Sequence, residues 1–129
     1  MRFYLDTSVA LHALLPGGDR QAVEWFDSLA ASDEVFSSTL IELELARVLR
    51  REQLDLAIGR VVLDRLNLVS LGDSTLRSAA TIEPHVKTLD AIHLATCLEL
   101  GAGVPLITHD QATRQAAALL DLTVLDPIR

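Results

Sequence analysis

The chain has 129 residues, which is enough for one domain with a buried core and too few for two. Half of the residues are hydrophobic and only 4% are aromatic, so aliphatic side chains must form most of the core. No apolar run reaches the roughly 18 residues that span a bilayer. Asp6 places a charge too early for a secretory signal, so we expect a cytoplasmic protein. A single cysteine, Cys97, excludes an internal disulfide and a zinc site built from cysteines.

The net charge is −7, from 11 basic and 18 acidic residues. Nucleic acids favour basic protein surfaces, so an acidic chain argues against a nucleic-acid partner. This objection weakens if four of the acids share one metal site, because the other residues then carry only −3. Net charge therefore leaves the partner open.

Hydrophobic periodicity and turn residues predict alternating strands and helices. The predicted strands are residues 2–5, 35–36, 68–71, 104–108 and 123–125. The predicted helices are residues 8–15, 20–31, 40–49, 55–66, 73–81, 90–100 and 110–120. Asp19 and Thr88 are expected to cap the helices that follow them, and residues 37–39 offer caps for the third helix. We therefore predict a three-layer α/β/α sandwich with a short central parallel sheet, formed as a single domain by residues 1–129.

Four acidic residues lie where predicted strands end or predicted helices begin. They are Asp6, Glu44, Asp90 and Asp110. If the strands are parallel, their carboxyl ends share one edge of the sheet, and these side chains converge on one pocket. Carboxylate oxygens are the ligands that Mg²⁺ and Mn²⁺ prefer. The spacing therefore predicts a divalent-metal site.

Each acid also has an ordinary structural interpretation. Asp6 and Asp110 are suitable N-caps, and Asp90 suits the first turn of a helix because of the helix dipole. Glu44 is spaced to pair with Arg47, and Glu42 remains an alternative for the pocket. The conjunction favours a site, because two carboxylates about 5 Å apart repel by roughly 3 kcal/mol at an effective dielectric near 20. A divalent cation would remove that repulsion.

Histidines and hydroxyl groups supply candidates for the surroundings of the site. His93 lies one helical turn after Asp90, and Ser8 and Thr108 flank the proposed pocket. A buried hydrogen-bonded histidine and ordinary capping hydroxyls are the competing interpretations. No HExxH motif is present, which argues against zinc-dependent hydrolysis.

Four segments together resemble the PIN-domain ribonucleases, and most closely the VapC toxins of prokaryotic toxin–antitoxin pairs. They are YLDTSV at 4–9, ELARVLRR at 44–51, LDAIHLATCLEL at 89–100 and LITHDQATRQAA at 106–117. The resemblance implies that Asp6, Glu44, Asp90 and Asp110 are catalytic metal ligands for Mg²⁺ or Mn²⁺. It also implies that Ser8 and Thr108 support them, and that water activated by the metal hydrolyses RNA.

The same resemblance implies partners. Arg50, Arg51, Lys87 and Arg114 are candidates to guide RNA phosphates, although solvated surface charge is the favoured interpretation of each one alone. A small antitoxin protein is expected to bind, and a homodimer is implied. Helices 40–49 and 56–66 are candidates for either contact.

The sequence leaves two other functional classes open. A receiver-type signalling domain has a similar length and an acidic Mg²⁺ pocket, but it needs paired acids after the first strand and a lysine after the last. Here only one acid follows the first strand, and the sole lysine, Lys87, lies well upstream. A catalytically silent module with the same fold is the other alternative, and an RNA cleavage assay separates it from a nuclease.

Overall fold

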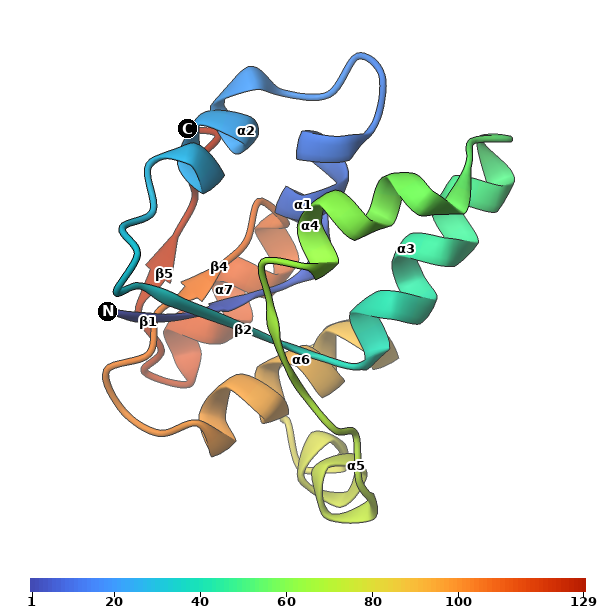
Figure 1. Cartoon of the computed structure of the whole chain (residues 1–129). Coiled ribbons are helices and arrows are strands. Elements are labelled where there is room, and N and C mark those ends of the chain that lie inside the picture. Colours follow the sequence, from blue (N-terminus) through green and yellow to red (C-terminus); the bar gives the residue numbers. More distant parts are fainter.

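A five-stranded parallel sheet crosses the molecule in the order β3-β2-β1-β4-β5, as a computed structural model of residues 1–129 shows (Figure 1). The strands are β1 (Arg2–Leu5), β2 (Glu34–Ser38), β3 (Asn67–Val69), β4 (Leu106–Ile107) and β5 (Val124–Leu125). Five strands lie near the positions that the hydrophobic runs predict, and every adjacent pair is parallel. The predicted parallel sheet is therefore confirmed.

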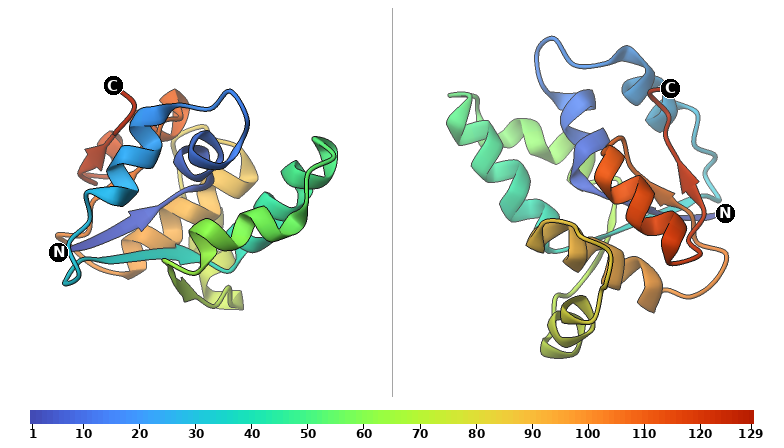
Figure 2. Two further views of the ribbon diagram at one scale, coloured as in Figure 1. Left: turned by 45° about the horizontal axis from the view of Figure 1, so that its top comes forward. Right: turned by 180° about the vertical axis from the view of Figure 1, so that it is seen from behind.

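Helices cover both faces of this sheet (Figures 1 and 2). They are α1 (Thr7–Leu14), α2 (Arg20–Asp27), α3 (Leu40–Arg51), α4 (Arg60–Leu63), α5 (Asp73–Ala80), α6 (Thr88–Glu99) and α7 (Gln111–Leu119), with a 3-10 turn η1 (Leu56–Gly59) before α4. One core cluster joins α1, α2, α3 and α4 to the sheet, and a second joins α6 and α7 to its other face. The three-layer α/β/α prediction is confirmed.

The strands divide their side chains between the two cores because successive strand residues point to opposite faces. Phe3 and Leu5 pack in the cluster under α1 and α2, whereas Tyr4 packs in the cluster under α6 and α7. Leu106 and Ile107 of β4 divide in the same way. Both faces of these central strands are buried, which explains their nearly continuous hydrophobicity.

Two helical segments differ from the prediction by more than two residues. The second helix ends at Asp27 rather than at residue 31. It stops because the Ser28 hydroxyl donates to the Trp25 carbonyl at 2.6 Å, and the Asp33 carboxylate accepts from the Ala30 amide at 2.8 Å to hold a turn. The segment predicted as a helix over 55–66 splits into the 3-10 turn η1 and the single turn α4, which meet at Gly59.

One predicted cap also needs correction. Thr88 is the first residue of α6 rather than its cap, because the extended backbone falls at Lys87, whose side chain has no acceptor. Before α3, the capping position is Thr39, but the hydroxyl that accepts from the Leu40 amide belongs to Ser38. Asp19 caps α2 as predicted, accepting from the Gln21 amide at 2.8 Å.

The carboxyl ends of the strands lie along one edge of the sheet, since all neighbours are parallel. Asp6 follows β1, Thr108 follows β4 and Asp126 follows β5 at this edge. The Asp6 amide continues the ladder by donating to the Ile107 carbonyl at 3.1 Å. Residues that are 100 positions apart in the chain are therefore neighbours here. No helix of the structure has the length and apolar character needed to cross a bilayer.

Candidate active site

A cavity of about 450 Å³, here called the acidic pocket, opens at this edge of the sheet. Its lining comprises Asp6, Thr7, Ser8, Leu11, Glu44, Val48, Lys87, Thr88, Leu89, Asp90, His93 and Asp110. The four acids that the sequence singles out thus line one cavity, although they come from four separate segments. Glu42 is exposed and does not line it, so the helix α3 presents Glu44 to the pocket and Glu42 to solvent.

Asp6 is buried, with 3% of its surface exposed, and hydroxyl groups hold both of its oxygens. Its Oδ1 accepts from the Ser8 amide at 3.0 Å and the Ser8 hydroxyl at 2.6 Å, and its Oδ2 accepts from the Thr108 hydroxyl. Burial raises the pKa of Asp6, and the two hydroxyl groups oppose that rise. A carboxylate can accept about four hydrogen bonds, so Asp6 retains one acceptor position, on Oδ2.

Glu44 is anchored through one oxygen by a buried chain of hydrogen bonds. Its Oε1 accepts from the Thr7 hydroxyl at 2.7 Å and lies 2.6 Å from Nε2 of His93. The other ring nitrogen of His93 lies 2.7 Å from the Tyr4 hydroxyl, beneath the sheet edge. Burial raises the pKa of Tyr4, so its hydroxyl stays protonated. This chain fixes the direction of Glu44, and its Oε2 receives no hydrogen bond.

Asp90 is half-buried in the first turn of α6 and receives no hydrogen bond from any side chain or amide. Its pKa is raised from 3.8 to about 6, first by burial and then by the negative charges of Asp110 and Asp6, with a smaller contribution from Glu44. The nearby His93 opposes this rise. The other three carboxylates of the pocket therefore act electrostatically on Asp90.

Asp110 caps α7 with one oxygen and turns the other toward no partner. Its Oδ2 accepts from the Thr113 amide at 2.8 Å and the Thr113 hydroxyl at 2.7 Å, whereas its Oδ1 receives no hydrogen bond. The N-cap interpretations of Asp6 and Asp110 are therefore correct, and both residues still line the acidic pocket. Capping and a role in the pocket are compatible because a carboxylate has two oxygens.

Each of the four acids thus keeps an acceptor that no group of the protein uses. No three acidic, histidine or cysteine side chains are grouped closely enough to surround one ion directly. Mg²⁺ commonly retains several waters and binds through one or two carboxylates. The donor set of the pocket fits an ion of this kind, and it does not fit a zinc cage of several direct protein ligands.

Comparison with known proteins agrees with the resemblance in the sequence. The sequence pattern of the PIN domain matches residues 3–119. The chain belongs to the PIN-domain family. Ribonuclease VapC35 of Mycobacterium tuberculosis is 33% identical over 131 residues, covering 96% of each chain. Ribonuclease VapC46 of the same organism is 32% identical, again with 96% of each chain covered.

The PIN fold of this chain is also shared by solved structures. The VapBC-1 structure from nontypeable Haemophilus influenzae superposes with a TM-score of 0.73 over all of both chains, at 18% identity. An identity this low establishes the shared fold alone. The predicted relationship to PIN domains, and to the VapC group within them, is confirmed.

The basic residues predicted at the rim of this PIN domain are not equivalent. Lys87 lines the acidic pocket and is exposed. Arg50, Arg51 and Arg114 do not line it: Arg51 lies 3.7 Å from Glu52, and Arg114 lies 3.5 Å from Asp126. Lys87 is thus the one residue of the four that lines the pocket.

Three residues in or beside the site are not among those that the sequence predicts. Thr7 and Tyr4 orient Glu44 directly and through His93, and nothing in their sequence context points to those contacts. Asp126 follows an apolar strand in the same way as Asp6, so strand-end position was an available signal. Its carboxylate is 6% exposed and lies 2.9 Å from Nδ1 of His109.

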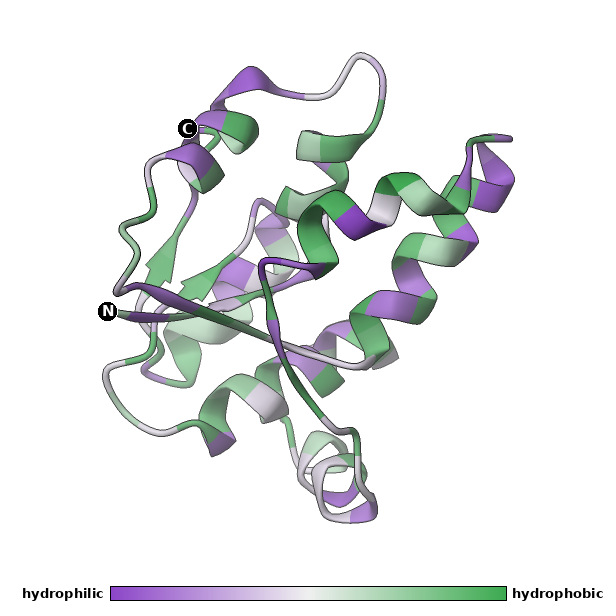
Figure 3. Ribbon diagram, in the orientation of Figure 1, coloured by the Kyte–Doolittle hydropathy of each residue, from purple (hydrophilic) through white to green (hydrophobic).

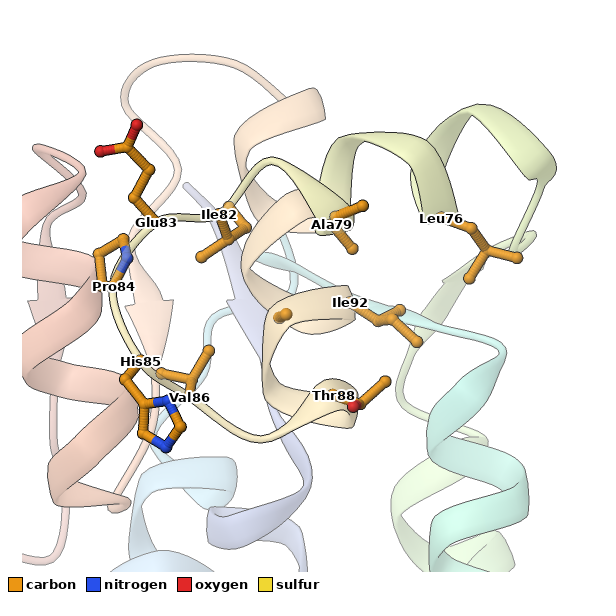
Figure 4. A pocket seen from close by; sticks show the side chains of 11 residues that line it. Leu76, Ala79, Ile82, Glu83, Pro84, His85, Val86, Thr88 and Ile92 are labelled. Carbon is orange, nitrogen blue, oxygen red and sulfur yellow. The ribbon is translucent and has the colours of Figure 1, made fainter.

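A second cavity, of about 360 Å³, lies between α5 and the start of α6 (Figure 4). Most of its lining is apolar, including Leu76, Ile82, Val86 and Ile92, and Glu83 is its one acid. Thr88 lines both this cavity and the acidic pocket. Unlike the candidate active site, this cavity has no set of polar groups that converge on one point.

Proposed function

We propose that this chain is an endoribonuclease that requires Mg²⁺ or Mn²⁺, with Asp6, Glu44, Asp90 and Asp110 as its catalytic carboxylates. The observation that carries the proposal is that these four acids line one cavity while each retains an acceptor free of hydrogen bonds. The 33% identity to a protein named as a ribonuclease supports the same activity. RNA is the expected substrate on that ground.

The side chains of the pocket have different roles in this proposal. Asp6 provides a fixed oxygen at the centre, because Ser8 and Thr108 hold its carboxylate in one orientation. Glu44, Asp90 and Asp110 supply oxygens around it, and Lys87 provides the positive charge that an RNA phosphate would meet. A bound divalent ion lowers the pKa of water and withdraws charge from phosphoryl oxygens. Preorganised ligands reduce the reorganisation that the reaction requires.

We also propose that the chain is the toxin of a toxin–antitoxin pair and that a small antitoxin protein binds it. The names of its VapC relatives support this proposal. Exposed apolar side chains are available for such a contact, among them Leu43 on α3 and Val61 on α4, which are 59% and 67% exposed. Figure 3 shows hydrophobic and hydrophilic residues alternating along α3. The same surfaces are available to a second copy of the chain as a homodimer.

The sheet order argues against the receiver-type alternative. Receiver domains have the strand order 2-1-3-4-5, whereas this sheet runs β3-β2-β1-β4-β5. Lys87 does line the acidic pocket, but it precedes α6 rather than following the last strand. The silent-module alternative predicts no cleavage of RNA with either metal, which the following experiment measures.

Glu44→Gln should lower the rate of RNA cleavage by roughly a hundredfold or more, because it removes a charged oxygen from the pocket. The glutamine carbonyl can still accept from Thr7 and His93, so the fold should be retained. Glu42→Gln is the matched control, since it changes the same group on the same helix outside the pocket. The assay is cleavage of single-stranded RNA with Mn²⁺, Mg²⁺ or EDTA. Equal activity in the two variants would contradict the assignment of Glu44.

Millimolar Mg²⁺ or Mn²⁺ should raise the melting temperature of the wild-type chain, because the ion relieves repulsion among the folded carboxylates. An ion at ten times its dissociation constant adds about 1.4 kcal/mol, or about 5 °C for a chain of this size. Thermal melting in EDTA and in each metal measures the shift, with Ca²⁺ and added NaCl as controls for general ionic effects. A melting temperature that ignores Mg²⁺ and Mn²⁺ would count against the site.

A further inference from the structure

A cavity of about 370 Å³ adjoins the acidic pocket and is here called the His12 cavity. It is lined by Ser8, Leu11, His12, Leu15, Pro16, Gly17 and Gly18. Ser8 and Leu11 also line the acidic pocket, so the two cavities share a wall. A chain molecule bound at the acids therefore has a space beside it for its next unit.

The imidazole of His12 is held from behind by a second histidine. The rings of His12 and His109 meet edge to face, with centroids 5.0 Å apart and planes at 88°. His109 is itself fixed at two points: its Nδ1 lies 2.9 Å from Asp126, and its amide donates to the Ser8 hydroxyl at 2.9 Å. Asp126 thus contacts His109, and His109 contacts His12, so the His12 ring is held in place in the cavity wall.

The backbone conformation of the glycine turn that lines the His12 cavity is also constrained. A Cβ atom on Gly18 would lie 2.0 Å from the His12 carbonyl oxygen, so only glycine fits where the turn closes on α1. Gly17 has a φ of +75°, and its amide donates no hydrogen bond within the chain. The two glycines therefore present backbone to the cavity, together with an amide that can donate to an anionic group.

The chemistry of this cavity suits a nucleotide. Unpaired RNA bases bind proteins largely by stacking on flat side chains, including histidine. Phe3, Tyr4 and Phe26 are buried, and neither Trp25 nor Phe36 lines the acidic pocket or the His12 cavity. The chain also has a net charge of −7, so flat side chains and free amides next to the acids, together with Lys87, are the features that RNA can use.

We propose that the His12 cavity binds the nucleotide next to the scissile phosphate of single-stranded RNA, with its base against the His12 imidazole. His12 is then a substrate-binding residue, and His109 and Asp126 are positioning residues that act through it. This inference rests on the nuclease function proposed above, because the cavity is defined as a subsite by its position beside the acids.

Steady-state cleavage of single-stranded RNA oligonucleotides with Mn²⁺ tests the subsite. His12→Ala should raise KM about tenfold, within the range for one stacked base, and leave kcat and the Mn²⁺-induced shift in melting temperature unchanged. His12→Phe should restore most of the binding because it restores a flat ring. His109→Ala should raise KM by a smaller factor. A substrate shortened until it has no nucleotide for the cavity should be cleaved equally by the wild type and His12→Ala.

The outcomes separate this inference from the proposed function. Cleavage by the wild type with an unchanged KM in His12→Ala would overturn the subsite and leave the nuclease intact. A loss of kcat or of the Mn²⁺-induced shift in His12→Ala would also overturn it, because the residue would then act on the catalytic centre. Failure of the wild type to cleave any RNA would remove both proposals.

Discussion

Replacing Asp6 with asparagine should lower metal-dependent RNA cleavage by at least about a thousandfold, on the order of the loss when one member of a catalytic unit is removed. Asp6 is the only one of the four acids whose two oxygens are both held, by Ser8 on one side and Thr108 on the other. No neighbouring carboxylate can therefore easily move into the position that the Asp6 carboxylate occupies. The substitution removes the negative charge at the most buried point of the pocket, where 3% of the residue is exposed.

The fold of the Asp6→Asn variant should be preserved. The asparagine oxygen can accept from Ser8, and its amide can donate to the Thr108 hydroxyl, which has capacity to accept. Asp19→Asn is the matched control, because Asp19 is also an N-cap aspartate but lies on α2, outside the acidic pocket. Asparagine caps helices about as well as aspartate. Retained cleavage in Asp6→Asn, with Asp19→Asn also active, would show that the catalytic centre lies elsewhere.

Replacing Asp90 with asparagine should stabilise the metal-free protein while it impairs cleavage. Asp90 has a folded pKa of about 6 against an ordinary value of 3.8, caused first by burial and then by Asp110 and Asp6. The folded state therefore binds a proton more readily than the unfolded state. The wild type gains stability as pH falls from 7.5 toward 4, and loses it as pH rises through about 6. Asparagine carries no charge and escapes that loss.

The size of this stabilisation follows from the pKa shift of Asp90, reduced to account for screening by solvent. Each pKa unit corresponds to about 1.4 kcal/mol, and screening at a half-buried group reduces the total to about 1–2 kcal/mol. Thermal melting in EDTA at pH 7.5 should therefore place Asp90→Asn about 5 °C above the wild type, and the difference should vanish near pH 4. Added Mn²⁺ should shift the variant less than the wild type. A variant less stable than the wild type in EDTA at pH 7.5 would refute the electrostatic account.

The two predictions have one physical origin. Carboxylates gathered without a cation destabilise the fold, and a group retained at a cost in stability is typical of functional sites. The Asp90→Asn variant should be more stable without metal and less active with metal. Replacement of a purely structural aspartate would not produce this combination. An aspartate that only interacted favourably with the dipole of α6 would lose stability when asparagine removed its charge.

The strand ends were predictable because their signals are local. The run RFYL before Asp6 and the run VPLIT before Asp110 mark buried strands, and parallel pairing then places both acids at one edge. Helical spacing favours Glu44 and keeps Glu42 as an alternative, because the two residues point in different directions and only the packing of α3 decides which one faces the pocket. The end of α2 at Asp27 was missed because the side chains of Ser28 and Asp33, rather than a Gly or Pro, stop it.

The amino-acid sequence alone determined the order of strands and helices, the acids at their ends and the membership of the PIN-domain family, since hydrophobic periodicity and short motifs are properties of neighbouring residues. Only the tertiary structure decided which oxygen of each acid remains free and how His93 connects Tyr4 to Glu44. The same is true of Asp126, which supports His12 through His109. These contacts join residues across the whole chain, and their geometry depends on packing that no local pattern encodes.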